Sequence, residues 1–230
     1  MSEAIYGTNL IVSAIRHGAE IRNLKIYNNK TVQTLAEEYG IKYEFVSKEE
    51  LNRITPNHQG AVAEVEEFKT YSLEELVSER KNLILVLDGI EDPHNLGAIL
   101  RTADAAQVAG IVLPKNRSVR LTGTVARVST GAIFTVKCAV VNNLNSALNK
   151  LKERGYWIYG AEAVAESRPY DEVEYDRKTV LVLGSEGKGL SRLVRESCDF
   201  LVKIPLFGTV NSLNVSVAAG ILIYHITKHQ

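Results

Sequence analysis

Short apolar runs that alternate with amphipathic segments constrain the fold of this chain more than any other feature. The run LILVLDGI, residues 83–90, is continuously apolar up to Asp88, which is typical of a strand buried on both faces of a parallel sheet. Further strands are expected at residues 110–114, 133–140, 157–163, 179–184 and 200–206, and helices at 94–107, 122–132, 144–155 and 214–226. This alternation predicts an α/β fold built on a parallel sheet.

The first part of the chain predicts a smaller α/β unit. Helices are expected at residues 10–15, 31–40 (with Thr31 as the N-cap) and 48–54, and strands at 24–27, 43–47 and 60–68. The segment 66–82 is charged and poor in apolar residues, so we place the boundary there. The predicted organisation is a first domain at 1–67, a linker at 68–82 and a second domain at 83–230.

Composition excludes several classes of protein. The formal net charge is zero, and the two cysteines, Cys138 and Cys198, predict neither a disulfide framework nor a metal motif. The five histidines show no metal-binding spacing either, so we expect no metal. The start of the chain does not resemble a signal peptide, and the longest apolar run, residues 215–223, is shorter than a bilayer span. We therefore expect a cytoplasmic protein.

The positive charge is unevenly distributed. No Asp or Glu occurs between Ala105 and Lys152, a stretch of 48 residues that contains seven Lys and Arg side chains. Such a stretch is usually a solvated face, but it is also a candidate surface for a polyanion.

The stretch TVLVLGSEGKGL, residues 179–190, is a strand that ends in a glycine-rich loop. It does not match the P-loop, because Gly189 follows Lys188 where Ser or Thr is required and Val182 stands where the first glycine is required. The dinucleotide pattern fails too, because Arg192 occupies the position of its last glycine. By itself the loop fits either a plain surface turn or a site where a ligand approaches the backbone.

Two other strand ends carry polar residues. Asn95 and Arg101 follow the strand that ends near Asp88, and Ser212 and Asn214 follow the last strand. Ligand sites of open α/β sheets lie beyond the carboxyl ends of the strands. Each cluster has a simpler reading, in which Asn95, Ser212 and Asn214 cap helices and Arg101 pairs with a neighbouring carboxylate.

Together the three clusters resemble the motifs of a known enzyme family. DPHNLGAILRTADAAQVAG, LVLGSEGKGLS and IPLFGTVNSLNVSVAAGI occur in this order, and the chain from Leu83 to Ile226 resembles the SpoU (TrmH-type) RNA ribose 2′-O-methyltransferases of the SPOUT superfamily. IYGTNLIVSAI and TPNHQGAVAEV resemble the accessory domain of the bacterial subgroup that modifies a guanosine in 23S rRNA. Departures are few: Leu206 stands where many members have Met, and Gln107 where the subgroup commonly has Gly.

The resemblance implies a fold, a cofactor and partners. The second domain is expected to be a SPOUT domain with a deep trefoil knot, preceded by a small L30e-like α/β domain that binds the RNA substrate. The cofactor implied is S-adenosylmethionine (SAM), and the partners implied are RNA and a second copy of the chain, joined through the knotted domain. The residues implied to bind SAM are Leu183, Gly184, Ile204, Leu206, Ser212 and Leu213.

The resemblance also implies catalytic residues, which are Arg101, Asn95, Glu186, Ser212 and Asn214. A guanidinium is effectively always protonated, so we expect Arg101 to bind a phosphate and stabilise the forming alkoxide rather than to act as a base. Asn95 and Asn214 are expected to orient Arg101 or the ribose, and Glu186 to fix its loop or pair with Arg101. In the acid-free stretch, the candidates for phosphate contacts are Lys115, Arg117, Arg120 and Arg127.

Three alternatives remain open at this point. One is a tRNA ribose methyltransferase, although tRNA enzymes of this family commonly lack an L30e-like module. Another is a noncatalytic RNA-binding or ribosome-assembly factor, against which the intact motif residues argue. A methyltransferase that protects the ribosome from an antibiotic is a narrower third reading.

Overall fold

The computed structural model describes residues 2–77 and 82–229, which form two units. The first consists of the described residues within Met1–Lys69 and Arg120–Thr135, and the second of those within Thr70–Val119 and Val136–Gln230. Residues 120–135 therefore pack with the N-terminal part of the chain. The predicted linker, 68–82, includes residues 78–81, which lie outside the described residues, and the predicted domain boundaries remain a prediction.

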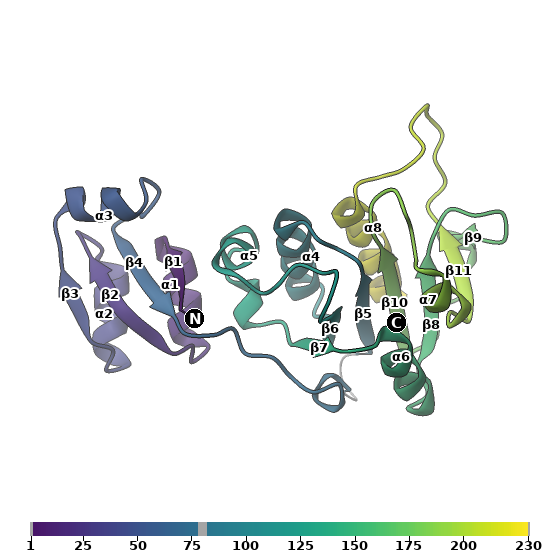
Figure 1. Ribbon diagram of the computed structural model, residues 1–230, viewed down its shortest axis with the longest axis horizontal. Coiled ribbons are helices and arrows are strands. Elements are labelled where there is room, and N and C mark those ends of the chain that lie inside the picture. The colour runs from purple at the N-terminus through teal and green to yellow at the C-terminus, as the bar shows by residue number, and fades with distance from the viewer. Residues whose placement is uncertain (1, 78–81, 230) are drawn as a thin grey trace. The chain divides into compact units, whose positions relative to one another are not determined.

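The first unit has a four-stranded sheet in the order β1-β4-β2-β3, where β4 runs antiparallel to both β1 and β2, and β3 runs parallel to β2 (Figure 1). Its elements are β1 (Glu3–Tyr6), α1 (Thr8–Arg16), β2 (Ile21–Ile26), α2 (Lys30–Glu38), β3 (Tyr43–Phe45), α3 (Lys48–Ile54), β4 (Ala61–Val65), α5 (Gly123–Val128) and η2 (Ala132–Phe134).

The second unit contains the parallel sheet that the apolar runs predict. Its order is β7-β6-β5-β10-β8-β11-β9, and every pairing in it is parallel. Its elements are η1 (Glu74–Leu76), β5 (Leu83–Asp88), α4 (Pro93–Ala105), β6 (Gly110–Pro114), β7 (Cys138–Val141), α6 (Leu144–Glu153), β8 (Trp157–Ala161), β9 (Arg168–Pro169), η3 (Tyr170–Glu172), β10 (Thr179–Gly184), α7 (Arg192–Glu196), β11 (Phe200–Lys203) and α8 (Val215–Lys228).

The central strands are buried on both faces, as their unbroken apolar sequences require. The first five residues of β5 and of β10 are all buried. On one face, Ile84, Val86, Val180 and Val182 pack with the apolar face of α6 and with Val194 of α7. Helix α8 packs against α4 and β10. No helix in the described part of the chain is long and apolar enough to cross a membrane.

The predicted strands 60–68, 157–163 and 200–206 end early, at Val65, Ala161 and Lys203, and three other local predictions were wrong. Asn29 rather than Thr31 caps α2, because its Oδ1 accepts from Val32 N while its Nδ2 is held by Thr8 and Gln59. Helix α4 begins at Pro93, one residue before the predicted start, because Asp92 caps it and proline suits the first helical position.

The third error concerns the predicted helix 122–132 and strand 133–140. The helix ends at Val128, and Gly131 takes a left-handed φ of 92° that starts a 3₁₀ turn. Strand β7 consequently begins only at Cys138.

Gln107, one of the two departures from the family pattern, follows the C-cap of α4 with a left-handed φ of 55°. Glycine adopts this conformation without the steric cost that a β-carbon brings. Gln107→Gly is therefore expected to raise the free energy of unfolding by about 1 kcal/mol. Gln107→Ala, which keeps the β-carbon, should give no such gain, and urea denaturation of both variants measures the difference.

Candidate active site

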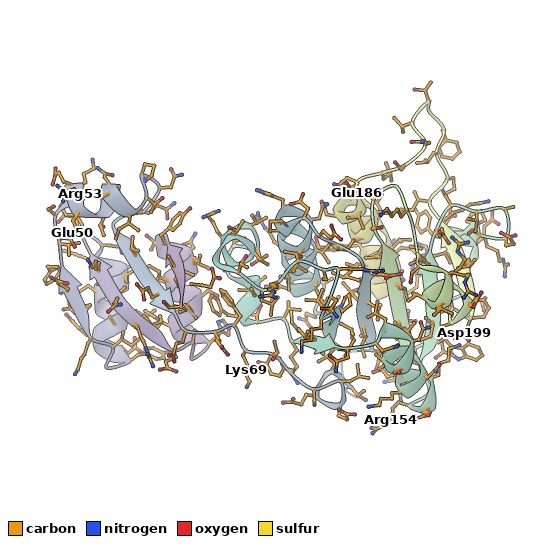
Figure 2. The ribbon with its side chains drawn as sticks, in the orientation of Figure 1. Glu50, Arg53, Lys69, Arg154, Glu186 and Asp199 are labelled. Atoms are coloured by element: carbon orange, nitrogen blue, oxygen red, sulfur yellow. The ribbon has the colours of Figure 1, made fainter. Side chains whose placement is uncertain are left out.

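The carboxyl ends of the parallel strands meet at one edge of the large sheet, and the loops after β5, β8, β10 and β11 begin there. Glu186, in the loop after β10, lies at this edge, whereas Arg154, which precedes β8, lies at the opposite end of the sheet (Figure 2). All three motif clusters therefore gather at the edge where open α/β sheets bind ligands.

The glycine-rich loop after β10 is a tight turn closed on itself. Ser185 N donates to Gly189 O at 3.2 Å, and Gly189 N donates to Ser185 O at 3.0 Å. A β-carbon on Gly184 would lie 2.3 Å from the carbonyl carbon of Gly189, so only glycine permits this approach. Since both of these N–H groups are used inside the turn, the loop does not present them to a phosphate as a P-loop does.

Glu162, which was not among the predicted site residues, follows the neighbouring strand β8 directly and holds this loop. Its Oε1 accepts from Leu190 N at 3.3 Å and from a terminal nitrogen of Arg195 at 2.6 Å, and its Oε2 lies 2.5 Å from Arg195 Nε. The hydrogen bond with Glu162 raises the pKa of Arg195. A β-carbon on Gly189 would lie 2.3 Å from Glu162 Oε1, so the loop backbone rests directly on the carboxylate.

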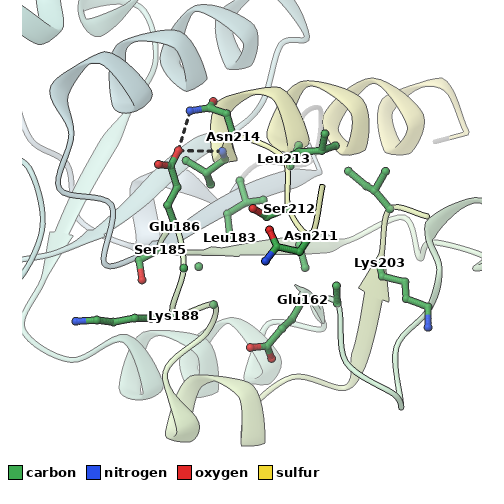
Figure 3. Close-up of a pocket in the computed structure, with 18 of the residues that line it drawn as sticks. Glu162, Leu183, Ser185, Glu186, Lys188, Lys203, Asn211, Ser212, Leu213 and Asn214 are labelled. Atoms are coloured by element: carbon green, nitrogen blue, oxygen red, sulfur yellow. Dashed lines mark hydrogen bonds between the residues drawn. The ribbon is translucent and has the colours of Figure 1, made fainter. Parts of the chain in front are cut away.

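Asn95, Glu186 and Asn214 form a hydrogen-bonded cluster, which we call the amide–carboxylate cluster. Glu186 Oε1 accepts from Asn214 Nδ2 at 2.7 Å and from Val215 N at 3.4 Å (Figure 3). The same oxygen accepts from Asn95 Nδ2 at 3.1 Å. Asn214 Nδ2 also donates to Asn95 Oδ1 at 2.9 Å. These bonds fix the orientation of both amides and join motifs that lie up to 119 residues apart.

The capping reading of Asn214 is also correct, because its Oδ1 accepts from Ser216 N and Val217 N at the start of α8. Asn95, in contrast, lies inside α4 and is 8% exposed, so it does not cap that helix. Arg101 is exposed on α4 and makes no hydrogen bond or ion pair with the cluster or with any other described residue. Glu186 was expected either to fix its loop or to pair with Arg101. Its hydrogen bonds to Asn95, Asn214 and Val215 fit the first role, and Glu186 forms no ion pair with Arg101.

A cavity of about 570 Å³ opens at this edge of the sheet. It is lined by the glycine-rich loop, by the segment after β11 and by the start of α8, with Glu162 on its wall (Figure 3). All six residues expected to bind the cofactor line it, together with Glu186 and Asn214 of the cluster: Leu183, Gly184, Ile204, Leu206, Ser212 and Leu213.

The four predicted phosphate contacts are divided between the units. Lys115 and Arg117 follow β6 in the second unit, and both are exposed. Arg120 and Arg127 belong to the first unit, where the Arg127 guanidinium lies over the ring of Tyr6 and bonds its hydroxyl. Among the described residues, no group of three or more His, Cys, Asp or Glu side chains could hold a metal ion.

Comparison with known proteins shows the family of this chain. Residues 82–224 match the family model of the SpoU rRNA methylases. The chain belongs to the SpoU rRNA methylase family. Residues 4–71 match a second model, described as RNA 2′-O ribose methyltransferase substrate binding. Membership confirms the resemblance found in the sequence and the prediction that the chain is an RNA methyltransferase.

Individual relatives agree with the family models. A TrmH family tRNA/rRNA methyltransferase of Bacillus subtilis, YacO, is 42% identical over 97% of this chain and 94% of its own length. The crystal structure of an AdoMet-bound rRNA methyltransferase from Sinorhizobium meliloti is 26% identical, with a TM-score of 0.86, and the match covers 99% of this chain and 87% of that one. The TrmH/SpoU tRNA modifying enzyme of A. aeolicus is 33% identical, with a TM-score of 0.60, and covers 68% of this chain and 79% of its own.

Proposed function

We propose that this protein transfers the methyl group of SAM to a ribose 2′-hydroxyl of RNA, and that the target is a guanosine of 23S rRNA. The observation that carries the proposal is that two of the three motifs line one cavity, while the first motif is joined to its wall by the hydrogen bonds of Asn95 with Glu186 and Asn214.

The cavity fits SAM in size and in chemistry. Its volume of about 570 Å³ lies within the range of small-molecule sites. Leu183, Leu206 and Leu213 give it apolar walls, and the carboxylate of Glu186 supplies negative charge that suits a sulfonium cation. When bound, SAM supplies an activated methyl group.

The residues around the cavity would align the reacting groups. The amide–carboxylate cluster presents amides in fixed orientations, which can position the ribose hydroxyl without reorganisation during the reaction. Ser212 lies on the cavity wall beside them. Arg101, whose guanidinium has no partner among the described residues, is available to bind the phosphate next to the target ribose and to stabilise the developing alkoxide.

The complete two-part organisation favours rRNA over tRNA. The rRNA methyltransferase of S. meliloti matches 99% of this chain, whereas the tRNA modifying enzyme of A. aeolicus matches 68%. The segment 4–71, which matches the substrate-binding model, would provide shape recognition of folded RNA. Lys115, Arg117, Arg120 and Arg127 would add contacts to phosphates.

We further propose that the protein is a cytoplasmic homodimer whose second unit is knotted and forms the interface. Val217 and Tyr224 of α8 are 51% and 54% exposed, and Phe207 is 97% exposed. A second copy of the chain would cover these apolar side chains.

Incubation with methyl-labelled SAM and either unmodified 23S rRNA or total tRNA tests the proposal. We expect label in 23S rRNA, recovered by mass spectrometry as 2′-O-methylguanosine. Label in tRNA alone would overturn the rRNA assignment. Measurable SAM binding with no label in either RNA would favour a precursor particle as substrate or the noncatalytic reading.

Glu162 is expected to act on SAM binding through the loop. Glu162→Ala removes the acceptor of Leu190 N and leaves Arg195 without its carboxylate, so the loop loses its support. We expect the Kd for SAM to rise about tenfold, which corresponds to the loss of about 1.4 kcal/mol of binding free energy. Calorimetric titration with SAM measures it. Glu166→Ala, on the same segment, is the matched control, and an unchanged Kd for Glu162→Ala would contradict the role.

A further inference from the structure

A second cavity lies in the same unit, across the glycine-rich loop from the first. Its volume is about 620 Å³, and it is lined by the loops that follow β5 and β6 and by the start of α4. Ser185, Glu186, Lys188, Gly189 and Val215 line both cavities, so the loop and the start of α8 form a shared wall.

The amide–carboxylate cluster spans this wall. Asn95 lines only the second cavity, Asn214 lines only the first, and Glu186 lines both. A group transferred from a ligand in the first cavity to a ligand in the second would therefore pass beside these three side chains.

The charged side chains of the second cavity include two that accept hydrogen bonds within the fold and three that do not take part in any with a described residue. The carboxylates of Asp88 and Asp92 are occupied, since they accept from Ser191 N at 2.7 Å and from His94 N at 2.8 Å. Glu91, Arg117 and Lys188 are exposed, and none of them forms a hydrogen bond or ion pair with a described residue.

Two of these groups are cations at the border of the cavity. Arg117 has a left-handed φ of 55°, a conformation that costs a non-glycine residue free energy and occurs preferentially at functional sites. The Lys188 side chain extends away from Asn211 and Ser212 of the first cavity (Figure 3).

We propose that the second cavity receives the target nucleotide of the RNA, with its phosphate at Arg117 and Lys188 and its base edge at Glu91. This inference rests on the proposed function and deepens it. A cavity with one free carboxylate and two free cations matches a nucleotide, which combines an anionic phosphate with a base edge. Proteins that recognise RNA sequence commonly form hydrogen bonds to the Watson–Crick edge of an unstacked base.

The carboxylate favours guanosine over the other nucleosides. An ionised carboxylate only accepts hydrogen bonds, through two oxygens side by side. Guanine is the one standard base whose Watson–Crick edge offers two adjacent donors, N1–H and the N2 amine, and a carboxylate can accept from both. Glu91 would therefore determine base specificity, and Arg117 would contribute affinity for any base.

The test uses the full-length protein and two synthetic RNAs that contain the mapped target site, one with guanosine and one with inosine, which lacks the N2 amine. We expect Glu91→Ala to lower kcat/KM for the guanosine RNA about 10- to 100-fold, the range for loss of a two-point base contact. Replacing the guanosine by inosine should lower the kcat/KM of the wild type to a similar extent. The same replacement should lower the kcat/KM of Glu91→Ala only slightly further. The Kd for SAM should not change.

Arg117→Ala should raise the KM for both RNAs by a similar factor and weaken the salt dependence of binding. Glu153→Ala and Arg154→Ala, at the opposite end of the sheet, are matched controls that should behave like the wild type.

Two kinds of failure can be distinguished. If the wild type binds SAM but methylates no RNA, the proposed function fails and the second cavity loses its role. If the wild type methylates RNA while Glu91→Ala and Arg117→Ala match its kcat/KM, or while inosine is methylated as well as guanosine, only the assignment of this cavity is overturned. A mapped target other than guanosine would overturn the role of Glu91.

Discussion

Replacing Arg101 by Ala is expected to lower kcat for methyl transfer about 10²- to 10³-fold, the effect of removing one preorganised donor from a developing oxyanion. The Kd for SAM should stay unchanged, because Arg101 does not line the cofactor cavity. Stability should change by no more than about 0.5 kcal/mol, because the side chain is exposed and has no partner among the described residues. Single-turnover methylation, SAM titration and thermal unfolding measure the three quantities.

The variant Arg101→Lys separates an electrostatic role from a role as general base. A lysine retains the charge but not the planar fork, so we expect partial activity and a pH profile that matches that of the wild type between pH about 6 and 9. A base with the lower pKa of lysine would instead recover activity as the pH rises through that range. Arg154→Ala serves as the control for loss of an exposed arginine, and wild-type turnover in Arg101→Ala would remove Arg101 from the mechanism.

The cofactor cavity could be anticipated from the sequence because it depends on two regular features. Parallel strands place all their carboxyl ends at one edge, and the three motifs each follow such a strand. Leu183 near the end of β10 and Ile204 just after β11 were therefore expected at the same edge once the parallel sheet was predicted. The bonds that join Asn95, Glu186 and Asn214 add the geometry that spacing alone did not supply.

Glu162 was missed because its role depends on contacts that are distant in sequence. The segment 157–163 was interpreted as one strand, but β8 ends at Ala161, and the next residue turns toward Leu190 and Arg195, 28 and 33 positions later. A carboxylate at the carboxyl end of a predicted buried strand was the available signal.

The segment 120–135 was also beyond prediction from local pattern. Gly123 N donates to Glu3 Oε2, and a β-carbon on Gly123 would lie 2.5 Å from Ala4 O. Ser13 Oγ donates to Gly131 O, and Ser13 also leaves no space for a β-carbon on Gly131. These contacts join residues more than a hundred positions apart, so periodicity could not indicate that this segment packs in the first unit.

Gly184→Ala is expected to abolish measurable SAM binding at concentrations that saturate the wild type. The added β-carbon would lie 2.3 Å from Gly189 C and 2.6 Å from Leu190 N, and both are backbone atoms that cannot move without opening the turn. Gly184 does not have a positive φ, so the effect is steric and not conformational. Overpacking of this kind costs about 1–3 kcal/mol of stability, and the displaced loop would also narrow the cofactor cavity.

Gly187→Ala is the matched control in the same loop. A β-carbon on Gly187 meets no atom within 4 Å, so the substitution carries only the cost of its φ of 80°, about 1–2 kcal/mol. Both variants should therefore lose some stability on thermal unfolding, but only Gly184→Ala should lose SAM binding in calorimetric titration. If Gly184→Ala bound SAM as the wild type does, the prediction would be wrong. The close packing of the turn against the strand end would then not shape the cofactor cavity, and Gly184 would be required only for the local fold.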